Sequence, residues 1–225
     1  MSTLGLVGGL GLGAGIYYYQ ELAKTLDARG ARLRLLLAHA DLLKVLGHVR
    51  AAEIGELTQY LRGIIQSLSL GGADFAAISA VVPHACIAEL TAASPIPILS
   101  ILDVVGAELD RRGLRRVALF GTRLVIETDL YGCLSVFEVA RPNAVEITMI
   151  DDTYRALAMR GHGTPQDREI LTSIALGLCS RERLDAIVLA GTDLSTLFET
   201  EEPEFPSIDC SRLHIAAIAE RLLRS

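Results

Sequence analysis

The sequence lacks the features that mark two large classes of protein. Its net charge is −6 and its Lys and Arg residues form no basic stripe, so we expect no nucleic-acid partner, because phosphate contacts need clustered cations. No apolar run reaches the roughly 18 residues that a membrane-spanning helix requires. The apolar start is rich in glycine and has no basic residues before it, unlike a signal peptide. We therefore expect no membrane association.

The sequence also lacks the cysteine spacing of a metal site or a disulfide framework. Its four cysteines form no CxxC pair, and no histidine cluster accompanies them: Cys86, Cys133, Cys179 and Cys210. A zinc site and a set of disulfides are therefore not expected. The pattern predicts a cytoplasmic protein with reduced thiols and no bound metal.

What the sequence does contain is a high hydrophobic fraction, 51%, which is ample for a packed core. The segment Asp185–Asp193 reads DAIVLAGTD. Its apolar run stops at small residues and a helical pattern follows, which is typical of a buried parallel strand and its ligand-binding end. The segment Asp74–Ala80 has the same character. Two similar strand ends predict two similar halves with a site between them.

The whole chain alternates strand and helix patterns, which predicts parallel sheets with right-handed crossovers. We expect two similar α/β domains with a cleft between them. The first would take residues 1–102 and 207–225, and the second 103–206. Among the expected elements are strands at 95–100 and 145–150, and helices at 83–93, 127–139 and 151–160.

Six short motifs occur in an order that resembles the aspartate/glutamate racemase superfamily over nearly the whole length. They are Gly8-Gly9-Leu10-Gly11, Gly72-Ala73-Asp74-Phe75, Pro95-Ile96-Pro97-Ile98-Leu99, Gly121-Thr122-Arg123 with Glu127 to Tyr131, Gly191-Thr192-Asp193-Leu194, and Phe205 to Cys210. The resemblance implies two α/β domains related by a pseudo-twofold axis, homodimers, and a cofactor-independent site between the domains. It also implies two thiols that act on opposite faces of the substrate α-carbon.

The sequence departs from this family at the residues that matter most. The two thiol positions are Ala80 and Gly191, and the polar pair after the first thiol is replaced by Val81 and Val82. Conventional two-thiol racemisation is therefore not expected. Of the remaining cysteines, Cys210 follows a strand end and is a slightly better replacement than the others, although a buried inert thiol is the simpler interpretation.

Three polar residues at the two strand ends are candidates for catalysis: His84, Thr192 and Asp193. His84 matches the family histidine and could be a general acid or base, because histidine side chains ordinarily titrate near neutrality, but a structural histidine is an equally good interpretation. Thr192 and Asp193 match the family Thr-Glu pair, and helix capping would also explain them.

Further residues are candidates for binding a small carboxylate: Gly9, Gly11, Tyr17, Val81, Val82, Thr122 and Arg123. Arg123 could hold an acidic group, and Thr122 could cap a helix. Glu127 and Tyr131 have the i, i+4 spacing of one helix face, and a structural role is expected for them.

Two hypotheses follow. In the first, the protein is an enzyme that moves a proton on a small carboxylate or amino-acid derivative, as an isomerase or lyase, without cofactor. In the second, catalysis has been lost and the protein binds a small acid or a protein partner.

Overall fold

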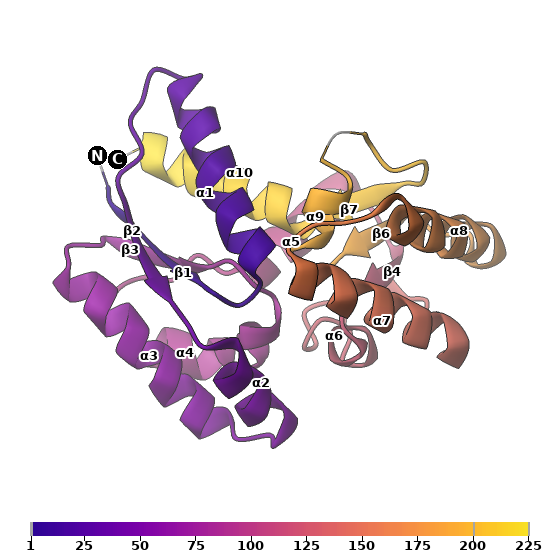
Figure 1. Cartoon of the computed structure of the whole chain (residues 1–225), viewed down its shortest axis with the longest axis horizontal. Coiled ribbons are helices and arrows are strands. Elements are labelled where there is room, and N and C mark those ends of the chain that lie inside the picture. Colours follow the sequence, from indigo (N-terminus) through magenta and orange to yellow (C-terminus); the bar gives the residue numbers. More distant parts are fainter. Residues whose placement is uncertain (1, 200, 225) are drawn as a thin grey trace. The chain divides into compact units, whose positions relative to one another are not determined.

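The computed structural model describes residues 2–199 and 201–224, and the chain divides into two compact units (Figure 1). The first unit comprises Met1–Ile101 and Leu213–Ser225, and the second Leu102–Arg212. The chain returns to the first unit inside the last helix, six residues after position 207, where the sequence predicts this return.

A three-stranded parallel sheet forms the centre of the first unit. Its strands are β1 (Leu4–Gly8), β2 (Leu35–His39) and β3 (Phe75–Ile78), in the order β2-β1-β3. The strand expected at 95–100 is wrong, because only one bridge, between Ala76 and Ile98, extends the sheet beyond β3. Two prolines in this segment cannot donate ladder hydrogen bonds, which shortens the pairing.

Helices cover both faces of this sheet (Figure 1). The helical elements of this unit are α1 (Leu12–Asp27), α2 (Leu42–Arg50), α3 (Ile54–Leu70), the 3₁₀ helix η1 (Val82–Cys86), α4 (Ile87–Ala93) and α10 (Cys210–Leu223). Because side chains alternate along a strand, Leu4 and Leu6 pack on one face against α1 and α10, while Val7 packs on the other against α3 and α4.

A four-stranded parallel sheet forms the centre of the second unit. It contains β4 (Arg116–Phe120), β5 (Glu138–Val139), β6 (Ala186–Leu189) and β7 (Ser207–Asp209), in the order β5-β4-β6-β7. The first three strands of each unit therefore have the same order, second-first-third. The expectation of a mixed α/β fold with two parallel sheets is confirmed.

The helices of the second unit include one that the sequence interpretation broke in two. They are α5 (Ile101–Arg112), α6 (Arg123–Glu127), α7 (Ala144–Arg160), α8 (Pro165–Glu182) and α9 (Leu194–Leu197). The strand expected at 145–150 is wrong, since these residues form the first turns of α7. A capping box explains the error: Asn143 accepts from the Glu146 backbone N–H, and the Glu146 carboxylate accepts from that of Asn143.

The helix expected at 127–139 is also wrong, because α6 ends at Glu127. Beyond it, three consecutive non-glycine residues have positive φ: Asp129 (50°), Leu130 (57°) and Tyr131 (56°). Burial of Leu130 and the ion pair between Arg141 and Asp129 (2.8 Å) accompany this left-handed turn. Glu127 and Tyr131 therefore do not share a helix face, since the turn separates them.

Candidate functional site

In the first unit, the carboxyl ends of β1 and β3 lie side by side. The Ser79 backbone N–H and its hydroxyl both donate to the Val7 carbonyl oxygen, at 3.0 and 3.1 Å. Gly9 has φ +84°, and a Cβ there would lie 2.5 Å from the Ala40 carbonyl oxygen. Glycine at this position thus lets the end of β1 approach the chain beyond β2 closely. Gly11 lies two residues further on, at the N-cap of α1.

The residue that the resemblance places at the first thiol position, Ala80, follows β3 by two residues and is buried. Val81 beside it is also buried, and Val82 begins η1. Methyl and isopropyl groups therefore stand where the resemblance predicts a thiol and two polar side chains. The Ser79 hydroxyl at this strand end is already bonded to Val7, and the next polar group along the chain comes from the following turn.

That polar group is His84, in η1, whose side chain is 1% exposed. Neither ring nitrogen has a hydrogen-bond partner of ordinary geometry among the described residues. Burial, followed by the proximity of His214, lowers the pKa of His84 to about 3, and the Ala80 and Val81 backbone opposes this only in part. The imidazole is therefore neutral at pH 7, with one N–H donor and one acceptor nitrogen.

His214, on α10, differs from His84 because both of its nitrogens have partners. Nε2 lies 2.9 Å from the Leu99 carbonyl oxygen, and Nδ1 lies 3.0 Å from the Tyr18 hydroxyl. A carbonyl oxygen can only accept, so the neutral ring carries its hydrogen on Nε2 and Tyr18 donates to Nδ1. Burial lowers the pKa of His214 to about 4. Tyr17, a binding candidate from the sequence, is 5% exposed and lies in the hydrophobic cluster between α1, α10 and the sheet.

In the second unit, the residue that the resemblance places at the other thiol position, Gly191, also follows its strand by two residues. A Cβ at Gly191 would lie 2.3 Å from Cε2 and 2.8 Å from Cζ of Tyr154, far below van der Waals contact. The ring of Tyr154, from α7, therefore fills the space into which a side chain at position 191 would project. The sequence analysis missed Tyr154, because nothing local to position 154 indicates a contact 37 residues away.

Tyr154 also contacts the candidate Asp193. The Tyr154 hydroxyl donates to Oδ2 of Asp193 at 3.5 Å, and both side chains are buried. Burial first, and then the Asp193 carboxylate, raise the pKa of Tyr154 well above its usual value near 10, so the phenol stays protonated. Asp193 is the N-cap residue of the four-residue helix α9 but makes no side-chain capping bond there.

Further polar groups lie at the same end of the sheet. Thr192 is buried, and its backbone carbonyl oxygen accepts a hydrogen bond from the Ser211 hydroxyl at 3.2 Å. Asp209, at the end of β7, accepts from the Ser195 hydroxyl at 2.7 Å. Burial raises the pKa of Asp209. Ser195 was not among the sequence candidates.

The structure assigns partners to the candidates Thr122 and Arg123. The Thr122 hydroxyl accepts from the Val125 backbone N–H (3.4 Å) and caps α6. The Arg123 guanidinium donates to Glu127 (3.2 Å) and to the Thr148 hydroxyl (2.8 Å). In this arrangement Arg123 links α6 to α7, and these bonds would compete with a ligand carboxylate.

The four cysteines are free, and two of them are fully buried. Burial raises the pKa of Cys86 and of Cys210, which disfavours the thiolate that acid–base chemistry or nucleophilic attack would need. Among the described residues, no group of three or more His, Cys, Asp or Glu side chains could hold a metal ion. Within the same residues, no helix is long and apolar enough to span a bilayer.

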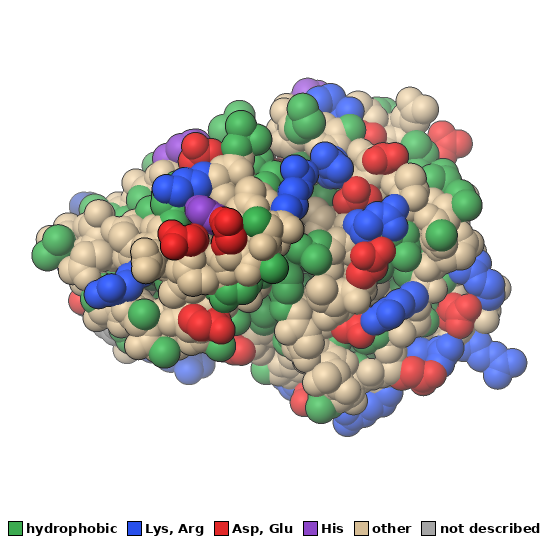
Figure 2. Space-filling model, turned by 90° about the horizontal axis from the view of Figure 1, so that it is seen from below, with side chains coloured by type: hydrophobic (Ala, Val, Ile, Leu, Met, Phe, Trp, Pro, Cys, Tyr) green, Lys and Arg blue, Asp and Glu red, His purple; other side chains and the backbone are tan. Residues whose placement is uncertain are grey.

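The surface carries charges of both signs close together. On the face that Figure 2 shows, Lys and Arg side chains lie among Asp and Glu side chains. Arg181 with Glu146 (2.9 Å) and Arg116 with Glu182 (3.0 Å) are examples of such pairs.

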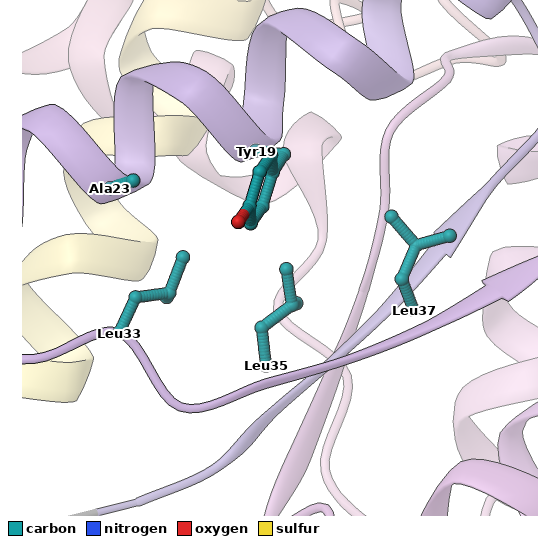
Figure 3. Close-up of a pocket in the computed structure, with 5 residues that line it drawn as sticks. All are labelled: Tyr19, Ala23, Leu33, Leu35 and Leu37. Atoms are coloured by element: carbon teal, nitrogen blue, oxygen red, sulfur yellow. The ribbon is translucent and has the colours of Figure 1, made fainter.

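An apolar pocket lies on the first unit, beside α1 and β2. It has a volume of about 450 Å³ and is lined by Tyr19 and Ala23 of α1 and by Leu33, Leu35 and Leu37 on and before β2 (Figure 3). The side chains that line it include no charged group and one hydroxyl, that of Tyr19, so it does not suit a small carboxylate.

Comparison with known proteins gives concordant results. A family model described as Asp/Glu/hydantoin racemase matches residues 7–218. A candidate Asp/Glu racemase from Yersinia pestis superposes with a TM-score of 0.85 at 22% identity, covering 99% of this chain and 100% of that one. An aspartate racemase homologue from Pyrococcus horikoshii OT3 gives 0.79 at 20% identity and full coverage of both chains. An arylmalonate decarboxylase variant, with one glycine changed to cysteine and one cysteine to serine, gives 0.51 at 15%, covering 99% and 92%.

Proposed function

Because the chain belongs to the Asp/Glu/hydantoin racemase family, we propose that it is a cofactor-independent enzyme that moves a proton at the carbon next to a carboxylate. The substrate would be a small acid or amino-acid derivative, and the reaction an isomerisation or a lyase-type step. The candidate catalytic residues are His84 in the first unit and Thr192 with Asp193 in the second.

The observation that supports this proposal most strongly is that the ring nitrogens of His84 are buried without hydrogen-bond partners among the described residues. A buried polar group without a partner costs about 1–3 kcal/mol, and both nitrogens of His84 are in this position among the described residues. A ligand oxygen that accepts from its N–H would remove that cost. Since the pKa is about 3, we assign to His84 the role of a neutral hydrogen-bond donor to a carboxylate or an enolate oxygen, and not that of a base.

The same reasoning determines which acids to test. Ala80 and Val81, close to His84 in the chain, are buried apolar residues, which favours a substrate with a hydrophobic portion over free aspartate. Ala80 and Gly191 cannot transfer protons, so we do not propose two-thiol racemisation.

The proposal is tested by incubating the protein in D₂O with a panel of acids and following the α-proton by NMR. The panel contains both enantiomers of aspartate and glutamate, 2-aryl propionates and aryl malonates. We expect deuterium incorporation or conversion for at least one acid, reduced by at least about 100-fold in H84Q. The variant H162Q, at an exposed histidine, is the matched control and should behave as wild type.

Folded wild-type protein that neither exchanges nor converts any acid of the panel would contradict the proposal. A thermal-shift assay with the same acids would then identify a binding protein without catalysis, because a ligand that binds only the folded state raises the melting temperature. The lack of thiols at both family positions is the observation that favours this second function.

We also propose that the protein is a cytoplasmic homodimer. An exposed apolar face on the first unit, consisting of Leu12, Ile16 and Tyr19 on α1 and Leu37 on β2, supports association. These four side chains are between 50% and 64% exposed. The free cysteines fit a reducing compartment.

A further inference from the structure

Tyr154 occupies the position in the second unit from which the family's second thiol would act. Its ring lies where the side chain of residue 191 would begin, with Cζ 2.8 Å from that Cβ position. The hydroxyl is bonded to Cζ, so a hydroxyl hydrogen is located in the same region as the missing thiol. Gly191 is required by this arrangement, because even a methyl group would overlap with the ring.

The Tyr154 hydroxyl lies beside the Asp193 carboxylate, which can accept its hydrogen. Tyr154 donates to Oδ2 of Asp193 over 3.5 Å, a long contact that leaves the hydrogen free to move to another acceptor. Asp193 makes no capping bond to α9, although helix capping was the alternative explanation for it. One proton donor and one carboxylate thus lie together at the end of β6.

We propose that Tyr154 and Asp193 form the acid–base pair of this protein, and that they remove and return the α-proton on one face of the substrate. This inference depends on the proposed function and names the groups that carry it out. A two-thiol site approaches the α-carbon from two sides, whereas here donor and acceptor belong to the same strand end.

The proton inventory balances over one cycle. The Asp193 carboxylate takes the α-proton as the C–H bond breaks, and the electron pair passes into an enolate. The Tyr154 hydroxyl then protonates the carbon and becomes a phenolate. The protonated Asp193 returns its proton to that phenolate through their hydrogen bond, which restores both groups without an external oxidant or cofactor.

The stereochemical consequence defines the reaction class. Because the proton leaves and returns on one face, the configuration at the α-carbon is retained. The substrate class is therefore a 2-substituted carboxylate with an α C–H bond, which undergoes exchange or a one-face proton shift and not racemisation.

The first experiment measures deuterium uptake and configuration together, for the acids that wild type exchanges in D₂O. We expect deuterium incorporation without formation of the opposite enantiomer on a chiral column. Y154F and D193N should each reduce kcat by at least about 100-fold with little change in KM, since only the transferring groups are altered. Y131F, at another tyrosine of the second unit, is the matched control and should retain the wild-type rate.

The outcomes separate the two proposals. Exchange with full racemisation, or an unchanged rate in Y154F, would overturn the Tyr154–Asp193 pair while the proposed function stands. Absence of exchange and conversion in wild type would remove the proposed function and the pair with it.

A second measurement tests the placement of the ring without reference to turnover. G191A should lower the urea midpoint of unfolding in the wild-type background but not in a Y154A background, because the methyl group then has room. G177A, where an added Cβ meets nothing within 4 Å, is the control. An equal effect of G191A in both backgrounds would show that the ring does not hold this position.

Discussion

At the scale of single residues, two buried histidines make the stability of the first unit depend on pH. Burial is the main cause of the low pKa values of His84, about 3, and His214, about 4. The unfolded chain has the ordinary value near 6.5. The folded values are lower, so the unfolded state binds more protons below pH 6.5. The contribution of the two neutral histidines to the free energy of unfolding is fully present above about pH 6.5. It is lost as the pH falls toward 4 and then 3.

We predict that each of these histidines lowers the free energy of unfolding by about 2 kcal/mol between pH 6.5 and pH 5. The H84Q variant removes one titrating group and should show about half of the wild-type pH dependence over this range. Urea unfolding at several pH values measures it, with H162Q at an exposed histidine as the control. Equal pH slopes in wild type and H84Q would contradict the prediction.

At the scale of elements, helix α7 positions Tyr154, and its start depends on one side chain. Oδ1 of Asn143 accepts from the backbone N–H groups of Val145 and Glu146, each at 3.0 Å. These groups have no partner within the helix.

We predict that N143A destabilises the second unit by about 1 kcal/mol, while N143D, which keeps an acceptor oxygen, stays close to wild type. Urea unfolding followed by circular dichroism measures the difference. Equal stability of N143A and N143D would mean that the cap does not contribute to the start of α7.

At the scale of the whole molecule, the exposed apolar face of Leu12, Ile16, Tyr19 and Leu37 determines the assembly that we propose. Ile16 and Leu37 are each about half exposed, and covering such side chains stabilises association.

We predict that light scattering after size exclusion gives twice the mass of the chain for wild type, and the mass of a single chain for I16E/L37E. M159E is the control, because Met159 is 86% exposed on α7, outside this face. A monomeric wild type would refute the dimer, and a dimeric I16E/L37E would place the interface elsewhere.

The alternation of apolar strands with helical patterns determined the α/β class and the parallel sheets, since each pattern is local and depends on a period of two or 3.6 residues. The motif positions likewise located both strand ends, and with them Ala80, His84, Gly191 and Asp193. The local hydrophobic pattern predicted the wrong secondary structure where helix capping or burial overrode it. The apolar residues 145–150 resembled a strand although a capping box started a helix, and the predicted helix after Glu127 gave way to a left-handed turn.

Only the tertiary structure decided which side chains meet at those strand ends. The ring of Tyr154, from α7, lies against Gly191 just beyond β6, and no spacing within the sequence encodes a contact between residues that far apart. The sequence identified His84 as a candidate residue, but the burial of both its ring nitrogens follows from packing between η1 and the elements around it. Local sequence determines secondary structure and strand ends, whereas long-range packing determines protonation and the space left for a ligand.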